Sequence, residues 1–387
     1  MAGEVRILAL FGGMARLGSE RANLEALTAL RQGGAEVRLV VSDAPWAEEV
    51  RRDVLARGFA ITQAPYLLLP RKERRFNPLI AYPITIARAS AILIREILRF
   101  RPTHIYASSQ MFVLNFLPAL AIMPTPLVYR CGDQPILHSR LFRALWRFIA
   151  WRARRFVAVS RFIADRLAES GVARARISVI YARPPTRLVT SAPSRTSPGF
   201  TFGFVGQINE TKGPHLLVEA FSDLARTYAD ARLVIAGRIS DWAGDEWARA
   251  LRDRVSADDD LSGKVSFPGF VEDVSALLGG CQVAVTPTVT EEPLANVVME
   301  AKAAGVPSIV FPSGGLPEIV EHGVDGYICA RRDAEALREA MIYYLERRDA
   351  VAGQGVAARA SLRRLGVDRF VEKWTAVVDP AGDGVAA

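Results

Sequence analysis

Glu292-Pro293-Leu294-Ala295-Asn296-Val297-Val298-Met299-Glu300 is the stretch around which the rest of the chain is best understood. It follows an apolar run at residues 283–285, and the helical pattern of residues 297–304 ends at Gly305. The pattern predicts a strand, a loop and a helix N-terminus, whose backbone N–H groups and dipole favour a phosphate. Carboxylates at Glu292 and Glu300 can then bind hydroxyl groups on either side of that phosphate. A nucleotide-sugar has this layout.

Length and composition indicate a two-domain protein. The chain has 387 residues, half of them hydrophobic, which is enough for more than one core. Its most apolar region, residues 79–98, contains Arg88, Arg95 and Glu96, which favours a buried helix over a membrane span. The apolar run at residues 7–11 is too short for a signal peptide, so we expect a cytoplasmic protein. Three cysteines lack metal or redox spacing and are expected to be buried, reduced thiols: Cys131, Cys281 and Cys329.

Charge differs between the two halves of the chain. Residues 1–190 contain 29 lysines and arginines against 13 aspartates and glutamates, a net charge of +16, and the remainder has a net charge of −8. This asymmetry favours an anionic partner: a membrane surface, a phosphorylated lipid or a nucleic acid. Residues 137–155 form a basic amphipathic pattern, which is either a solvated helix face or an interfacial helix on anionic lipid. Four arginines are expected on one face of this helix: Arg140, Arg143, Arg147 and Arg154. Trp146 and Trp151 are expected nearby.

Apolar runs alternate with helical patterns in both halves, which predicts an α/β fold with doubly wound sheets. In the first half the strands are residues 6–11, 37–41, 104–107, 127–129 and 156–160. In the second half they are residues 201–205, 232–237, 265–267, 283–285 and 308–311. The first loop does not match the G-x-G-x-x-G dinucleotide fingerprint, so a nicotinamide cofactor is not expected.

A Ser/Thr/Pro-rich stretch after Pro184-Pro185 marks the predicted domain boundary. We therefore predict an N-terminal acceptor-binding domain at residues 1–185, a linker at 186–199 and a nucleotide-sugar-binding domain at 200–365. Residues 366–378 are expected to form a C-terminal helix that packs back on the N-terminal domain.

Three motifs of the second half occur together in one order. They are Gly206-Gln207-Ile208 with Lys212-Gly213, the Glu292 and Glu300 pair, and residues 314–320 with Gly323-x-x-Gly326. In order and spacing the second half resembles the retaining glycosyltransferases of family 4, also called group 1. Residues 18–34 and 158–160 extend the resemblance more weakly into the first half. The resemblance implies the GT-B architecture, in which two Rossmann-like domains face each other across a cleft.

The resemblance also implies roles for individual residues. Glu300 is expected at the nucleotide ribose, Glu292 at the donor sugar, Lys212 at the diphosphate and the amides of residues 295–297 at the phosphate. Lysine and the helix dipole supply the positive charge, and there is no Asp-x-Asp motif, so neither a metal nor a cofactor beyond the donor itself is expected. The complete predicted donor-binding set is Gly206, Gln207, Lys212, Glu292, Leu294, Ala295, Asn296, Val297 and Glu300.

Two departures from the family pattern are evident. Gln207 stands where the family usually has an arginine, which removes one cationic contact to the diphosphate. The family histidine after the strand that ends at Tyr129 is also missing; Asp133 is the first candidate to replace it and His138 the second. Asp133 is equally well explained as a cap of the next turn. The predicted catalytic residues are Lys212, Glu292 and Asp133, and those on the acceptor side are Gly13, Gly18, Ser19 and His138.

The expected reaction is transfer of a sugar from a nucleotide-diphosphate sugar to an acceptor, with retention of the anomeric configuration. The basic first half suggests a lipid-linked or cell-envelope glycan acceptor and peripheral attachment to the anionic inner face of the plasma membrane. An epimerase or a phosphorylase of the same architecture is the alternative. A nucleic-acid-binding module is disfavoured, because no binding motif or aromatic ladder is present.

Overall fold

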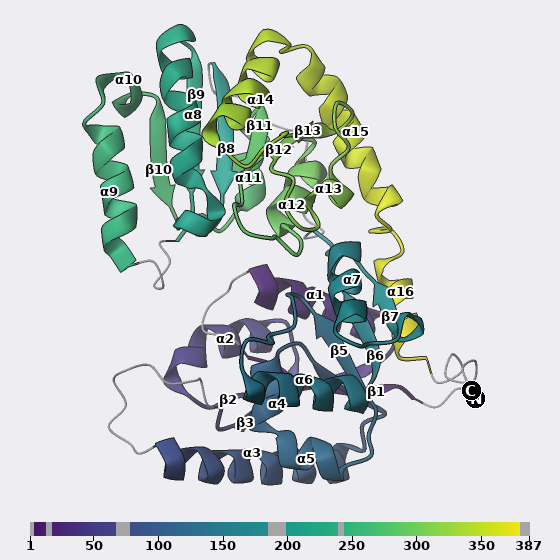
Figure 1. The fold of residues 1–387 in the computed structure, drawn as a ribbon. Helices are drawn as coiled ribbons and strands as arrows, with labels where there is room; N and C mark the ends of the chain where they lie inside the picture. Colours follow the sequence, from purple (N-terminus) through teal and green to yellow (C-terminus); the bar gives the residue numbers. More distant parts are fainter. Residues whose placement is uncertain (1–3, 13–17, 67–77, 185–198, 239–243, 380–387) are drawn as a thin grey trace. The chain divides into compact units, whose positions relative to one another are not determined.

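The computed structural model describes residues 4–12, 18–66, 78–184, 199–238 and 244–379. The chain forms two compact units (Figure 1). Unit 1 comprises Met1–Tyr181 together with Arg369–Ala387, and unit 2 comprises Ala182–Asp368. The C-terminal segment therefore belongs to the same unit as the N-terminus, although unit 2 separates them in the sequence.

Unit 1 is built on a seven-stranded sheet with the order β3-β2-β1-β4-β5-β6-β7, in which all neighbours pair in parallel. Its strands are β1 (Arg6–Leu10), β2 (Glu36–Ser42), β3 (Ala60–Ala64), β4 (His104–Ala107), β5 (Leu127–Cys131), β6 (Ala153–Ala158) and β7 (Ile177–Val179). Its helices are α1 (Gly18–Gln32), α2 (Glu48–Ala56), α3 (Pro78–Phe100), α4 (Gln110–Asn115), α5 (Leu117–Ile122), α6 (Arg140–Arg152), α7 (Arg161–Glu169) and α16 (Phe370–Val377).

The C-terminal helix α16 completes the core of unit 1. Trp374 is buried, and its ring centroid lies 6.0 Å from that of Tyr106 on β4. Val377 and Phe370 belong to the same apolar cluster, together with Leu27 of α1. Because this contact closes the layer over the sheet with large side chains, α16 contributes directly to the stability of unit 1.

Unit 2 repeats the design on a six-stranded parallel sheet with the order β10-β9-β8-β11-β12-β13. Its strands are β8 (Phe200–Val205), β9 (Ala231–Ala236), β10 (Val265–Gly269), β11 (Val283–Thr286), β12 (Ser308–Val310) and β13 (Gly326–Ile328). Its helices are α8 (Pro214–Thr227), α9 (Gly244–Ser256), α10 (Asp259–Ser262), α11 (Val274–Gly279), α12 (Asn296–Ala304), α13 (Leu316–Ile319), α14 (Ala334–Glu346) and α15 (Ala350–Arg364).

The predicted α/β fold with doubly wound sheets is confirmed in both units, because each strand order reverses direction once. The reversal falls between β1 and β4 in unit 1 and between β8 and β11 in unit 2. In such sheets, ligands bind in the crevice outside the carboxyl ends of the strands at this topological switch point. The fold therefore indicates one candidate crevice in each unit.

The predicted basic helix of residues 137–155 is too long by several residues. Helix α6 begins at Arg140, where Ser139 caps it by accepting from the backbone N–H of Phe142, and it ends at Arg152. Arg154 lies in β6, so its predicted place on the helical face is wrong. The reason is that Ala153 adopts an extended backbone and pairs with Leu127 of β5.

Burial distinguishes the two tryptophans of α6, because Trp146 is buried and Trp151 is exposed. The three cysteines are free and buried, as predicted. Of the helices in the described residues, none is both long enough and apolar enough to cross a membrane.

Candidate functional site

The loop after β8 is fixed by its own side chains and by glycine. Asn209 caps the turn Glu210–Lys212, because its Oδ1 accepts from the backbone N–H of Lys212 at 3.0 Å. Gly213 has a φ of 73°, and a Cβ there would lie 2.1 Å from the carbonyl oxygen of Pro287. Only glycine permits this close approach, so the sequence places Lys212 against the loop that follows β11.

Lys212 meets Glu292 at the switch point of unit 2. The ammonium group of Lys212 forms an ion pair with Oε2 of Glu292. The Lys212 side chain is 33% exposed and that of Glu292 is 10% exposed, so the lysine is accessible while the carboxylate is largely covered. Two of the three residues predicted to be catalytic, 80 positions apart in sequence, are therefore in direct contact.

The glycine motif after β12 holds the backbone of Glu292. The N–H of Glu292 donates to Oγ of the buried Ser313 at 3.0 Å, and its carbonyl accepts from the N–H of Gly315 at 2.8 Å. Gly314 has a φ of 52°, and a Cβ at that position would lie 2.1 Å from the carbonyl oxygen of Glu292. The motif thus orients a predicted donor-sugar residue through the backbone.

Glu291 reinforces this arrangement, and the sequence interpretation missed it. Its Oε2 accepts from the N–H of Gly314 at 2.7 Å, and its Oε1 accepts from Nη2 of Arg332 at 2.8 Å. Arg332 also donates to the carbonyl oxygen of Pro312. The only sequence signal for this role is the position of Glu291 beside Glu292.

Helix α12 begins next to this loop. Its N-cap, Ala295, has no side chain that could accept from the first-turn amides. Leu294 and Ala295 are buried, and Glu300 is 4% exposed. Gln207 lies in the loop after β8, half-buried, where its Oε1 accepts from Nδ2 of Asn209 at 3.3 Å. A nucleotide phosphate at the start of α12 would meet the positive end of a helix whose N-cap residue has no side-chain cap.

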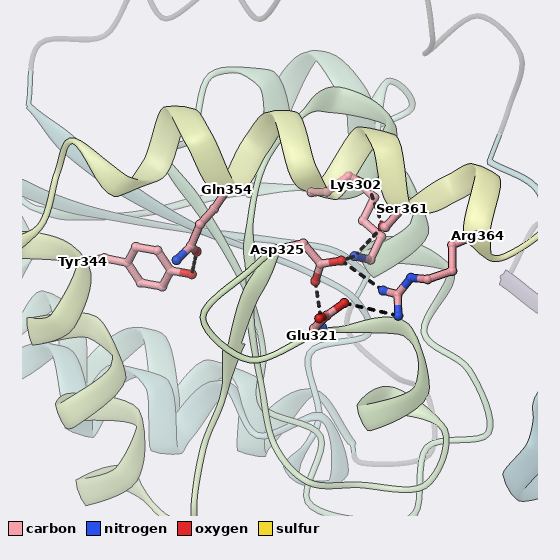
Figure 2. Close-up of polar contacts among 8 residues, drawn as sticks. Lys302, Glu321, Asp325, Tyr344, Gln354, Ser361 and Arg364 are labelled. Carbon is pink, nitrogen blue, oxygen red and sulfur yellow. Dashed lines mark hydrogen bonds and ion pairs between the residues drawn. The ribbon is translucent and has the colours of Figure 1, made fainter.

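A buried ion pair anchors the last turn of α12 (Figure 2). Nζ of Lys302 lies 2.6 Å from Oδ2 of Asp325, and both side chains are 1% exposed. Nζ also donates to Oγ of Ser361 on α15 at 3.0 Å. Arg364 of α15 lies 3.4 Å from the same aspartate oxygen and 3.4 Å from Oε2 of Glu321. Burial lowers the pKa of Lys302, which the ion pair with Asp325 opposes.

Two of the predicted acceptor-side residues, Gly18 and Ser19, are the first two residues of α1 in unit 1, and both are exposed. Gly13 lies outside the described residues. His138 is exposed just before α6, and its ring centroid lies 5.0 Å from that of Phe142.

Asp133 lies in the turn that follows β5. It is exposed, and its Oδ1 accepts from the backbone N–H of Gln134 at 2.7 Å. This is a local contact between neighbouring residues, and the turn-cap interpretation drawn from the sequence stays a prediction. Its proposed role in place of the family histidine stays a prediction.

Sequence comparison divides the chain as the fold does. Residues 17–182 match the family model described as Glycosyltransferase Family 4, and residues 199–347 match the model described as Glycosyl transferases group 1. The chain is 37% identical over 131 residues to the spore coat protein SA of Bacillus subtilis, covering 32% of this chain and 33% of that protein. It is 35% identical over 169 residues to a glycogen synthase of Mycobacterium tuberculosis, covering 43% of this chain and 38% of that enzyme. These matches span only about a third of each relative's length.

Solved structures match over nearly the whole chain. HepE from Anabaena in complex with UDP and glucose has a TM-score of 0.79 at 19% identity, covering 99% of this chain and 100% of that one. A glycosyltransferase from Rickettsia africae has a TM-score of 0.80 at 17% identity, covering 98% and 100%. At this level of identity the likeness establishes the fold. Together with the two family models, which cover each unit in turn, it shows that the chain belongs to the group 1, family 4 glycosyltransferases of GT-B fold.

Proposed function

We propose that this glycosyltransferase moves a sugar from a nucleotide-diphosphate sugar to an acceptor with retention of the anomeric configuration, without a metal ion or other cofactor. The contact between Lys212 and Glu292, beside the start of α12 where the N-cap residue Ala295 makes no side-chain cap, carries the proposal. HepE, a structural neighbour, was crystallised with UDP and with UDP-glucose, which supports a donor of this class.

In this proposal Lys212 exchanges its partner when the donor binds. In the ion pair the lysine charge is balanced by Glu292. A diphosphate at the start of α12 brings greater negative charge, which attracts the flexible ammonium group and frees Glu292 to accept from sugar hydroxyls. Glu300, buried on the same helix, accepts from the ribose hydroxyls. The remaining predicted donor-site residues belong to the loops after β8 and β11 and to the first turn of α12.

The transfer step itself places most of the task on the leaving group. The acceptor hydroxyl oxygen forms a bond to the anomeric carbon while the bond from that carbon to the diphosphate oxygen breaks, and the nucleoside diphosphate leaves with the electron pair. Attack on the face from which the diphosphate departs retains the configuration, and a diphosphate oxygen takes the acceptor proton. Lys212 and the amides of α12 stabilise the charge that develops on that group.

Replacement of Lys212 by alanine tests the donor site. We expect turnover to fall by about 10²–10³, the size found for loss of one preorganised charge-stabilising group. The circular dichroism spectrum should be unchanged, because the lysine is partly exposed and belongs to no core. Glu300→Gln should mainly weaken UDP binding in calorimetry. Lys373→Ala on α16 is the control, and a fully active Lys212→Ala enzyme would refute the assignment.

The acceptor is proposed to be a lipid-linked or cell-envelope glycan reached at an anionic membrane surface. Helix α6 supports this, because its exposed face combines arginines with Leu141 and Trp151, whose exposed fractions are 56% and 72%. Its exposed arginines are Arg140, Arg143 and Arg147. A face of this kind suits the headgroup region of an anionic leaflet.

Vesicle flotation tests the membrane proposal. Wild-type protein should bind vesicles containing phosphatidylglycerol and ignore pure phosphatidylcholine at low salt. Arg147→Glu should weaken binding by about fivefold or more, because each arginine near an anionic surface contributes about 1 kcal/mol. Arg363→Glu on α15, an exposed arginine of unit 2, is the control. Binding that does not depend on the lipid charge would contradict the proposed anionic surface, and the absence of any vesicle binding would favour a soluble acceptor.

A further inference from the structure

Three side chains converge at the switch point of unit 1, and the catalytic proposal uses none of them. Asn23 comes from the second turn of α1, Tyr106 from β4 and Arg130 from β5. Their exposed fractions are 8%, 1% and 5%. Tyr106 and Arg130 lie toward the carboxyl ends of their strands, where the crevice of a doubly wound sheet opens.

The three are joined by hydrogen bonds to a single oxygen. Oδ1 of Asn23 accepts from the Tyr106 hydroxyl at 2.6 Å and from Nη1 of Arg130 at 3.2 Å. Nδ2 of Asn23 donates to the carbonyl oxygen of Ser19 at 2.9 Å, which fixes the orientation of the amide. Arg130 is therefore held close to the first turns of α1 by a neutral partner.

Arg130 is a buried cation without a counterion among the described residues. None of the carboxylates that the structure describes pairs with it, and Oδ1 of Asn23 is the one hydrogen-bond acceptor it has there. Burial raises the pKa of Tyr106, and it raises the pKa of the adjacent Cys131 thiol to about 12, so neither supplies a negative charge at neutral pH. Burial lowers the pKa of Arg130, yet a guanidinium keeps its proton in proteins.

The surroundings of Arg130 add to this imbalance. The guanidinium of Arg130 lies beside Gly132, because a Cβ at that position would lie 3.1 Å from Nη1 of Arg130. A larger residue at position 132 would crowd the guanidinium. The nearby start of α1, a helix of 15 residues, presents the positive end of its dipole. A buried cation without a counterion is costly, and an anion bound here would pair with Arg130 and interact with the positive end of α1.

We propose that Arg130, held by Asn23 and Tyr106, forms an anion-binding subsite at the switch point of unit 1 that takes a phosphate or carboxylate group of the acceptor. The assignment to the acceptor rests on the proposed function, whereas the anion site itself does not. A guanidinium has several N–H donors in a planar fork, and the bond to Asn23 leaves most of them for the oxygens of such a group.

Inorganic phosphate is the first probe, with binding read from thermal shift and calorimetry on the full chain. Phosphate should raise the Tm of the wild-type protein by mass action. Arg130→Met should bind phosphate at least tenfold more weakly, since hydrogen bonds to charged groups are among the strongest in proteins. Arg154→Met, on β6 of the same unit, should bind as the wild type does. Equal phosphate shifts in wild type and Arg130→Met would overturn the subsite.

UDP is the second probe, and it separates acceptor from donor. Arg130→Met should leave the UDP affinity within about twofold of the wild-type value, whereas Lys212→Ala should weaken UDP binding and leave the phosphate response of unit 1 intact. A parallel loss of UDP binding in Arg130→Met would overturn the acceptor assignment. A wild-type protein that binds phosphate but not UDP would refute the proposed donor site without touching Arg130.

Stability without ligand separates a binding role from a structural one. Arg130→Met removes an unpaired buried charge and leaves no carboxylate behind, so its Tm should be equal to or above that of the wild type. A large fall in Tm, accompanied by an unchanged phosphate affinity in Arg130→Lys, would assign a structural role instead. Arg130→Lys keeps the charge and loses the planar fork, so it should fold and bind phosphate more weakly than the wild type.

Discussion

At the switch point of unit 2 the cation Lys212 is paired with the carboxylate of Glu292, whereas at that of unit 1 the cation Arg130 donates to the amide of Asn23. The two crevices share one topology, since each opens where a parallel sheet reverses its strand order. They differ in how the charge is balanced before a ligand arrives. A paired cation can bind a ligand by exchanging partners, while an unpaired buried cation needs the ligand to supply the negative charge.

The same contrast holds within unit 2 between the site and its support. Lys302 and Asp325 form a pair that is closed to solvent, while Lys212 remains one-third exposed. The closed pair joins α12 to the turn before β13 and, through Ser361, to α15 (Figure 2). Charge that is paired and buried supports the fold, and charge that is paired and accessible remains available to a ligand.

The largest expected effect is on the closed pair. Asp325→Asn should lower the free energy of unfolding by about 3–5 kcal/mol, because it leaves Lys302 buried without a counterion. Urea denaturation followed by circular dichroism measures the change. The double variant Lys302→Met with Asp325→Asn should recover part of the loss, since no uncompensated charge remains. The comparison fails if Asp325→Asn alone lowers stability by less than about 1 kcal/mol, the value of an exposed pair.

Glu321→Gln provides the matched control for that experiment. Glu321 pairs with Arg364, which also pairs with Asp325. The side chains of Glu321 and Arg364 are each about half exposed. Its loss should lower stability by at most about 1 kcal/mol, because solvent screens such pairs.

An intermediate effect is expected from the glycine that supports Glu292. Gly314→Ala should lower stability by about 1–3 kcal/mol from the positive φ alone, and it should also reduce turnover at least tenfold by displacing the Glu292 backbone. Gly323→Ala is a matched control, because Gly323 also has a positive φ, of 77°, but a Cβ there would meet nothing within 4 Å. If both variants lose turnover equally, the loss reflects stability and not the position of Glu292.

The smallest effect is expected in unit 1. Tyr106→Phe should lower stability by about 0.5–1.5 kcal/mol, the net contribution of one neutral hydrogen bond, because Asn23 keeps its bond from Arg130. Thermal denaturation detects it. Tyr344→Phe on α14, which loses a similar buried bond to Gln354, should lower stability by a similar amount. A loss above about 3 kcal/mol for Tyr106→Phe alone would mean that Arg130 depends on this hydroxyl, contrary to the proposed arrangement.

Much of the fold was predictable because periodicity and glycine positions are local signals. The alternation of apolar runs with helical patterns predicted doubly wound sheets, and the glycine after residue 304 predicted the end of α12, where Gly305 adopts the left-handed conformation. The end of α6 was mispredicted. Residues 153–155 continue the helical pattern, and pairing of Ala153 with β5 overrides it.

For the sites, the sequence by itself predicted which residues of unit 2 would bind a nucleotide-sugar, because their motifs lie in short segments with fixed spacing. Only the tertiary structure decided that Glu292 pairs with Lys212, that Glu291 and Gly314 hold its backbone, and that Lys302 and Asp325 are buried together. It also brought Arg130 to Asn23 across 107 residues of sequence. The physical reason is that charge balance and burial depend on which strand and helix ends meet, and local sequence patterns do not contain that information.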